Sequence, residues 1–241
     1  MEYDGSDYHG FQIQPGTPTI QGALEVALAE ITQGCDEGAP GRVVGAGRTD
    51  AGVHAVGQVI HFDSLWSRST VELQRAVNAL LPLDIAVRDL AVAPDGFHAR
   101  YSASSRQYVY SVLNQEERSP LRERYSYRVS GETDIAAMNK AASYAIGTHD
   151  FAAFGQPPSG SITVRTLYRA DWTREGDVVE FVVVANAYLR KMVRRLVGTL
   201  LWVGQGTMSS KEFEDILLKG DIGRSAPSVP PCGLCLTRVN Y

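Results

Sequence analysis

The residues best placed to do chemistry lie in the segment VVGAGRTDAGVHA, residues 43–55. Glycines border its charged tripeptide, residues 48–50, on both sides. Glycine adopts backbone angles that other residues avoid and leaves room for a ligand. We therefore expect an exposed loop between two strands, with Asp50 at its tip. An ionised carboxylate there could act as a nucleophile or accept a proton. It would need a nearby cation, because burial without one raises the pKa of a carboxyl group.

The spacing of these glycines excludes two nucleotide-binding loops. Asp50 interrupts the pattern GxGxxG, and no helix pattern follows, unlike in a dinucleotide-binding loop. The GK[ST] element of a phosphate-binding P-loop is missing. The pattern alone leaves one alternative open, which is a turn aspartate that hydrogen-bonds its own backbone.

The histidines and cysteines do not form a metal-binding pattern. His54 and His61 flank the loop, and we interpret both as structural. Cys35 is isolated, whereas Cys232 and Cys235 form one CxxC pair. A zinc site would need two more ligands, and the sequence has no second CxxC and no close histidine pair. We expect two unrelated thiols and no metal.

The charge of the chain is unevenly distributed. The net charge of −4 by itself argues against a nucleic-acid partner. However, residues 1–97 hold 5 basic and 13 acidic side chains, whereas residues 98–200 hold 14 and 10. The middle of the chain could therefore meet phosphates. The apolar runs are far shorter than the roughly 20 residues of a membrane helix. The N-terminus is polar and acidic, unlike a signal peptide, so we expect a cytoplasmic protein.

Hydrophobic patterns predict an α+β fold in two halves, residues 1–97 and residues 98–241. Thr19 is the expected cap of the first helix, and Ser69 or Thr70 that of the second. Helices are predicted over residues 19–34, 69–81, 133–147, 188–204 and 209–220. Strands are predicted over residues 42–47, 56–62, 84–93, 104–114 and 125–131, in a hairpin over 163–187 and over 233–241. The pattern alone leaves open whether the two halves share one sheet.

Five segments, in order along the chain, resemble the tRNA pseudouridine synthases of the TruA family. GRTDAGVHA resembles the signature of that family. The other segments are EYDGSDYHGFQIQPGTPTIQGALEVAL, FHARYSASSRQYVYSVLN, NAYLRKMVRRLVGTLLWVGQG and APSVPPCGLCLTRVNY. Five ordered blocks over nearly the full chain are far more specific than one motif.

The resemblance implies an isomerase that converts uridine to pseudouridine at positions 38, 39 and 40 of tRNA, in the anticodon stem-loop. The glycosidic N1–C1′ bond breaks, the uracil turns, and C5 bonds to C1′ without a cofactor or metal. The implied fold is two ferredoxin-like halves that share a mostly antiparallel sheet around a central catalytic cleft. The implied assembly is a homodimer in which tRNA touches both subunits.

The same resemblance gives three residues catalytic roles. Asp50 is the catalytic carboxylate, which attacks C1′ or removes the C2′ proton to form a glycal; both routes stay open. Arg194 takes the arginine position of the family and is expected to pair with Asp50, with a solvated basic helix face as the alternative. Tyr108 matches the active-site tyrosine, which stacks on the everted uracil and could move the C5 proton. The alternative for Tyr108 is a core aromatic, a role that suits Tyr110 better.

Four further residues are expected at the substrate. Leu234 matches a leucine that packs against the target base, and Arg48 matches an arginine that fills the gap left by the everted nucleotide. Arg100 resembles a phosphate contact of the family, and Arg68 is a weaker candidate for the same task.

Two other function classes are weighed against the isomerase. A catalytically silent RNA-binding protein would not need the intact set of Asp50, Tyr108 and Arg194. A hydrolase acting on a sugar would need a second placed acid, and none is evident. The chain departs from the family at its start, where the usual first strand is nearly absent, so we expect a shortened strand or a truncated start. It also has Tyr188 where the family usually has phenylalanine and Cys235 where the family often has an aromatic residue.

Overall fold

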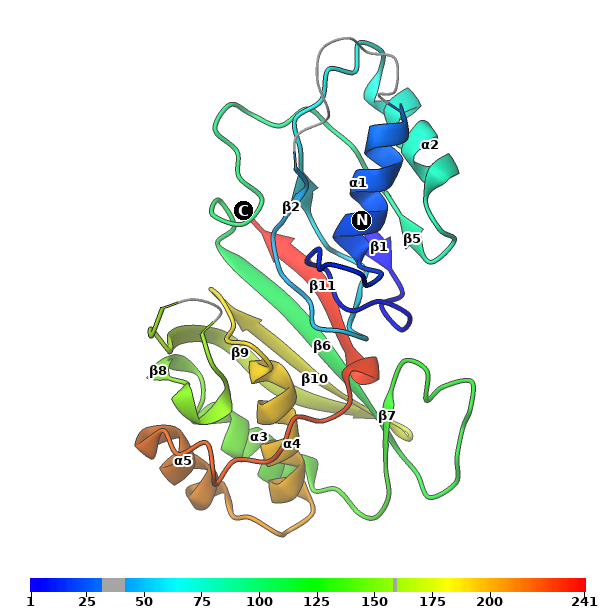
Figure 1. Cartoon of the computed structure of the whole chain (residues 1–241). Helices are drawn as coiled ribbons and strands as arrows, with labels where there is room; N and C mark the ends of the chain where they lie inside the picture. Colours follow the sequence, from blue (N-terminus) through cyan, green and yellow to red (C-terminus); the bar gives the residue numbers. More distant parts are fainter. Residues whose placement is uncertain (32–41, 158–159) are drawn as a thin grey trace. The chain divides into compact units, whose positions relative to one another are not determined.

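The computed structural model describes residues 1–31, 42–157 and 160–241 (Figure 1). These residues form two compact units. The first unit consists of Met1–Ser104 together with Leu236–Tyr241, and the second consists of Ser105–Cys235. The end of the chain therefore belongs to the unit in which the chain begins.

The first unit is built on short antiparallel strands. Tyr3 lies opposite Ile85 on one side and opposite Ala55 on the other, which makes the N-terminal strand central to this sheet. A separate strand pair places Val44 opposite His61. The sheet order is β5 (Ile85–Ala86), β1 (Glu2–Tyr3), β3 (His54–Ala55), β11 (Leu234–Asn240), and the separate pair is β2 (Val44–Gly45) with β4 (Ile60–His61).

Two capped helices complete the first unit, α1 (Ile20–Ile31) and α2 (Thr70–Leu80). The predicted cap of α1 is confirmed, because the Thr19 hydroxyl accepts a hydrogen bond from the Gly22 N–H at 3.2 Å. Ser69 caps α2 in a capping box with Glu72, which satisfies two otherwise unpaired backbone N–H groups. The predicted extension of the first helix to residue 34 lies outside the described residues.

The second unit has longer strands, and their order is β6–β10–β9–β8, all in antiparallel pairs. β7 pairs with β6 in parallel. The bounds are β6 (Ser105–Asn114), β7 (Tyr127–Val129), β8 (Gly147–Asp150), β9 (Val164–Glu175) and β10 (Val178–Ala185). The α+β class predicted from the sequence is confirmed, with mostly antiparallel pairing in both units.

One face of this second sheet is buried under helices. Alternate residues of β10, from Val179 to Ala185, are almost fully buried, whereas those between them are only half-buried. Strand periodicity places the buried set on one face. Three helices lie together beside this sheet (Figure 1): α3 (Ile135–Ser143), α4 (Met192–Gly204) and α5 (Ser210–Lys219). No helix of the described residues is both long and apolar enough to cross a membrane.

Several predicted element bounds are wrong; the strand predicted over residues 56–62, for example, covers only Ile60–His61. The helix predicted from residue 188 begins at Met192, because Lys191 adopts a left-handed φ of 63°. The strand predicted over residues 84–93 covers only Ile85–Ala86. The helix predicted over residues 133–147 ends at Ser143, and its last predicted residue starts strand β8 instead.

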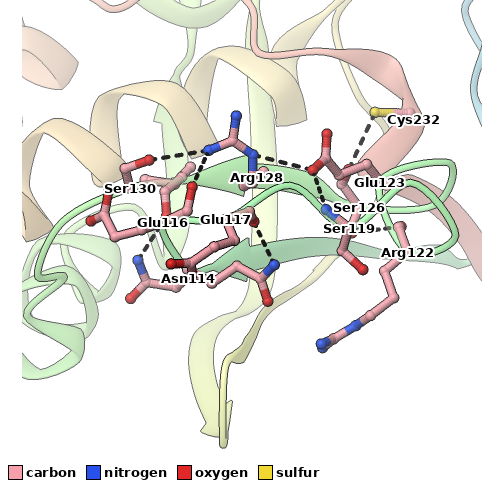
Figure 2. A network of polar contacts seen from close by, with 12 residues as sticks. Asn114, Glu116, Glu117, Ser119, Arg122, Glu123, Ser126, Arg128, Ser130 and Cys232 are labelled. Atoms are coloured by element: carbon pink, nitrogen blue, oxygen red, sulfur yellow. Dashed lines mark hydrogen bonds and ion pairs between the residues drawn. The ribbon is translucent and has the colours of Figure 1, made fainter.

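The connection from β6 to β7 is held by side chains rather than by regular structure (Figure 2). The Arg128 guanidinium lies 3.2 Å from the Glu123 carboxylate and donates to the Glu116 carbonyl at 2.9 Å. The Asn114 amide donates to the carbonyls of Val129, which ends β7, and of Gly131, at 2.9 and 2.8 Å. Backbone groups outside a ladder need such partners, so this connection is an ordered loop.

The close approach of β11 to Gly57 predicts that Gly57→Ala destabilises the protein. An added Cβ would lie 2.1 Å from the Thr237 carbonyl oxygen, so the backbone of β11 would have to move. We expect a loss of about 1–3 kcal/mol in the free energy of unfolding, measured by urea denaturation. Gly223→Ala is the matched control, because its added Cβ would meet only the Asp221 carboxylate at 3.2 Å. Equal stability of the two variants would contradict the close approach.

Candidate active site

The loop that carries Asp50 joins β2 to β3 and is fixed mainly through its backbone. The Phe11 N–H donates to the Thr49 carbonyl at 3.1 Å, and the Gly52 N–H donates to the Tyr8 carbonyl at 3.2 Å. A tight turn is closed by the Val53 N–H, which donates to the Asp50 carbonyl at 3.1 Å. The segment before the first helix therefore holds the backbone of the loop in place.

Glycines are required where this segment contacts the loop. Gly10 has a φ of 92°, and an added Cβ would lie 2.7 Å from the Thr49 carbonyl oxygen. Gly52 has a φ of 75°, in the left-handed region that favours glycine. Gly10 thus allows the two backbones to approach, and Gly52 allows the chain to turn after Asp50.

A buried hydrogen-bond network fixes the start of the same loop. The Gln58 side chain, 1% exposed, donates to the Gly47 carbonyl at 2.9 Å and accepts from the Gly47 N–H at 3.3 Å. Its amide also lies 3.3 Å from the Tyr3 hydroxyl, which is 2.8 Å from the Thr49 hydroxyl. The network thus ends one residue before Asp50. Neither Gln58 nor Tyr3 was predicted from the sequence as a site residue; a lone glutamine within the apolar pattern VGQVIHF was the available signal.

The loop presents different amounts of its side chains to solvent. Thr49 is buried, Asp50 is half-buried and Arg48 is exposed. A half-buried carboxylate on a fixed loop can be reached by a ligand while its backbone stays in place. Such a group can serve as a nucleophile or base without a large rearrangement.

The two other arginines predicted in this unit occupy different settings. Arg100 is half-buried in the turn of residues 98–102. Arg68 is exposed just before α2, with its guanidinium carbon 6.0 Å from the centroid of the Trp66 ring. Both belong to the same unit as Asp50.

Tyr108 lies on β6 in the second unit and is 7% exposed. The Tyr188 ring meets it edge-on, with centroids 5.1 Å apart and planes at 86°. The Tyr188 hydroxyl lies 3.0 Å from the carbonyl oxygens of Arg106 and Val183 and donates to them. Burial, and then the neighbouring Tyr108, raise the pKa of Tyr188 well above its ordinary value. Tyr188 is therefore a neutral support that fixes the orientation of the Tyr108 ring.

Tyr110 is a core residue, as predicted. It is 0% exposed, and its hydroxyl donates to the Pro230 carbonyl at 2.8 Å. Burial raises the pKa of Tyr110, whereas the positive charge of Arg194 acts in the opposite direction. Arg194 therefore lies near this phenol.

Arg194 is half-buried in the first turn of α4. Its Nε donates to the Val229 carbonyl at 2.7 Å, and its own carbonyl accepts from the Val229 N–H at 3.3 Å. The next residue, Arg195, donates to the Ser225 hydroxyl and the Ala226 carbonyl. These two side chains bind the segment before β11 rather than forming a freely solvated basic face.

Leu234 begins β11 and is 6% exposed. It follows a single 3₁₀ turn, Pro231–Gly233, which packs closely on Tyr110: a Cβ on Gly233 would lie 2.9 Å from that ring. Tyr108, Arg194 and Leu234 thus belong to the second unit, whereas Asp50, Arg48, Arg100 and Arg68 belong to the first.

These features define a class of protein: an α+β protein with a half-buried carboxylate on a loop whose backbone is held by hydrogen bonds. Comparison with known proteins specifies the class. The family model for tRNA pseudouridine synthase matches residues 1–102 and 141–241. The tRNA pseudouridine synthase A of Geobacillus sp. (strain WCH70) is 41% identical over 242 residues, covering 100% of this chain and 96% of the relative. Those of Geobacillus kaustophilus and Bacillus subtilis are 42% and 40% identical, covering 92% and 97% of their lengths.

This chain belongs to the tRNA pseudouridine synthase family. The resemblance drawn from the five sequence segments is thereby confirmed, and so is the predicted enzyme class, an isomerase.

The network around Gly47 predicts that Gln58→Leu destabilises the first unit and loosens the loop. Leucine would leave the half-buried N–H and carbonyl of Gly47 without their partners, a cost of about 1 kcal/mol for each group. Thermal denaturation and amide hydrogen exchange across residues 46–53 would measure both effects.

Gln74→Leu is the matched control. The Gln74 amide donates to the Val87 and Arg88 carbonyls at 3.0 and 2.9 Å, in a part-exposed setting where water can replace it. A Gln58→Leu protein as stable as the control, with unchanged exchange in the loop, would show that the network does not hold the loop.

Proposed function

We propose that this chain isomerises uridine to pseudouridine at positions 38, 39 and 40 in the anticodon stem-loop of tRNA, with Asp50 as the catalytic carboxylate. The observation that carries the proposal is the loop of residues 46–53, which holds a half-buried Asp50 on a fixed backbone in a chain related to tRNA pseudouridine synthases over its full length. Action in the cytoplasm as a homodimer is part of the same proposal.

The reaction needs a group that stabilises C1′ of the ribose, which becomes electron-poor as the uracil leaves. The bond from C1′ to N1 breaks, the uracil turns, and C5 forms the new bond to C1′. The C5 proton then leaves, and N1 ends with a proton, so the product is an isomer of the substrate. An ionised Asp50 either bonds to C1′, in a bond that breaks when C5 attacks, or removes the C2′ proton to give a glycal, which regains a proton at C2′ when C5 bonds to C1′.

Two residues of the second unit complete the proposed chemistry. We assign to Arg194 the positive charge that keeps the carboxylate ionised. A guanidinium suits this role, because it stays charged and one of its nitrogens is already held by the Val229 carbonyl. We assign to Tyr108 the stacking surface for the everted uracil and the transfer of the C5 proton. The edge contact with Tyr188 holds its ring in place.

The remaining candidates bind RNA in this proposal. The exposed Arg48 fills the gap left by the everted nucleotide, and Leu234 packs against the target base. Arg100 and Arg68 contact phosphates. Everting a base costs a few kcal/mol, so these binding contacts contribute to turnover as well as to affinity.

The proposal predicts that the protein releases tritium from tRNA labelled at uracil C5 and that Asp50→Asn abolishes this release. The amide has the size of the carboxylate but is a poor nucleophile and base. We expect the rate to fall by at least about 1,000-fold, with tRNA affinity within a few-fold of wild type. Carbodiimide mapping of the product tRNA would locate the modified positions.

Asp63→Asn, at an exposed position of the same unit, is the matched control and should turn over normally. Binding without tritium release by the wild-type protein would show a silent RNA-binding protein. Release of free uracil would show a hydrolase. Substantial turnover by Asp50→Asn would refute the role of the carboxylate.

Tyr108→Phe should keep base stacking and slow the late proton step. The ring stays the same, so we expect a KM close to wild type and a kcat lowered by about 10²-fold or more, measured under single-turnover conditions. Tyr188→Phe provides the comparison. It removes the hydroxyl contacts to Arg106 and Val183, at a cost of about 1 kcal/mol in stability, but no proton donor from the reaction. Normal turnover by Tyr108→Phe would leave stacking as the only role of this side chain.

A further inference from the structure

A column of five aromatic rings runs through the first unit and ends at the surface. Neighbouring ring centroids lie 4.9, 6.3, 4.7 and 4.3 Å apart along the column. In order the rings are Tyr241, Phe97, His61, His98 and Tyr101. The last ring is the unusual one, because Tyr101 is 80% exposed.

The exposed ring is nevertheless held in a defined orientation. Tyr101 stacks on His98 with an angle of 27° between the planes. The turn beneath it is closed twice, since the Ser102 N–H donates to the His98 carbonyl at 2.9 Å and the His98 N–H donates to the Ser102 hydroxyl at 3.0 Å. The stack covers one face of the phenol, and the exposure of Tyr101 leaves the other face to solvent.

Both imidazole rings in the column are fixed by backbone donors. His98 Nδ1 accepts from the N–H groups of Arg100 and Tyr101 at 3.2 and 3.1 Å. His61 Nδ1 accepts from the Ala99 N–H at 3.0 Å. Burial, and then the neighbouring His98, lower the pKa of His61, against a smaller opposing effect of Asp63. The backbone donors therefore hold both imidazole rings in place beneath Tyr101.

The column is connected to the loop that carries Asp50. His61 lies on β4, opposite Val44 on β2, and that strand leads directly into the loop. At the other end of the column, the Tyr241 hydroxyl donates to the Ala99 carbonyl at 2.9 Å. The exposed ring thus belongs to the same folded unit as the proposed catalytic carboxylate.

A single exposed aromatic residue needs no special explanation, because much of any protein surface is apolar. Tyr101 differs because its ring is already oriented and because one flat face of it is left open to solvent. Such a surface suits an unpaired nucleobase, since every base offers a π-face and proteins that bind single-stranded RNA use aromatic rings in this way.

We propose that Tyr101, supported by His98, is a stacking platform for an unpaired base of the tRNA substrate. The inference rests on the proposed action on tRNA and extends it by naming a binding position outside the catalytic set. The partner is an RNA base, because the ring is planar, exposed on one face and held in a fixed orientation by the His98 ring.

Binding of an unmodified tRNA transcript to the full-length protein tests the platform without requiring turnover. Base stacking on an aromatic side chain is worth enough to change affinity by about 10- to 100-fold, so Tyr101→Ala should raise the Kd by that factor. Tyr101→Phe should stay within about twofold of wild type, and Tyr101→Trp should bind as tightly or more tightly. Tyr168→Ala is the matched control, because Tyr168 is 56% exposed and lies on β9 in the second unit.

A second measurement identifies stacking directly. In anticodon-arm RNAs carrying 2-aminopurine at one loop position at a time, wild type and Tyr101→Phe should quench the fluorescence at one position, and Tyr101→Ala should not. Wild-type affinity of Tyr101→Ala, or equal losses in Tyr101→Ala and Tyr168→Ala, would overturn the platform. A changed sedimentation coefficient of Tyr101→Ala with unchanged RNA affinity would also overturn it and show a protein contact instead. The proposed function fails separately, if the wild-type protein binds tRNA but forms no pseudouridine.

Discussion

The structure depends on holding the loop that carries Asp50 in place without regular secondary structure. Backbone N–H and carbonyl groups in such a loop still need partners. Here the backbone around Phe11 and the side chain of Gln58 are those partners, and the Tyr3 hydroxyl binds the side chain of Thr49. Because Tyr3 also lies at the centre of the first sheet, sheet pairing and loop geometry are stabilised together. The N-terminal residues are therefore part of the site as much as part of the fold.

The second unit also holds candidate site residues in place, but these are one aromatic and one positively charged side chain. The ring of Tyr108 is oriented by the neutral Tyr188, which meets it edge-on. Tyr188 is held in turn by its hydroxyl, which has two backbone carbonyls as acceptors. Arg194 is a long, flexible side chain, and its hydrogen bond to the Val229 carbonyl reduces the entropy that it would lose on binding a partner. In both cases the backbone positions a functional group, and the chemistry is left to the end of the side chain.

Sequence patterns predicted the long elements and missed the short ones for a physical reason. β6, β9, β10, α2 and α5 show clear periodicity with caps or turns, and they appear as expected. β1, β3 and β5 have two residues each, too few for any period, and their pairing is decided by tertiary contacts. The same limit applies to the site. Glycines marked the loop around Asp50, but its bonds to Gln58 and Tyr3 join residues 11 and 46 positions apart.

The charge distribution constrains how such a chain can hold tRNA. Residues 1–97 carry 13 acidic and 5 basic side chains, so phosphates gain little from this part of the chain, although it contains the proposed catalytic carboxylate. The 14 basic side chains of residues 98–200 are better suited to neutralising phosphates. Apart from single basic side chains such as Arg68, contacts made by this acidic part must then rely on interactions that do not depend on net charge, such as stacking and hydrogen bonds to bases. The oriented ring column that ends at Tyr101, just beyond this acidic stretch but in the same folded unit, offers such an interaction, because stacking on an aromatic face does not depend on net charge.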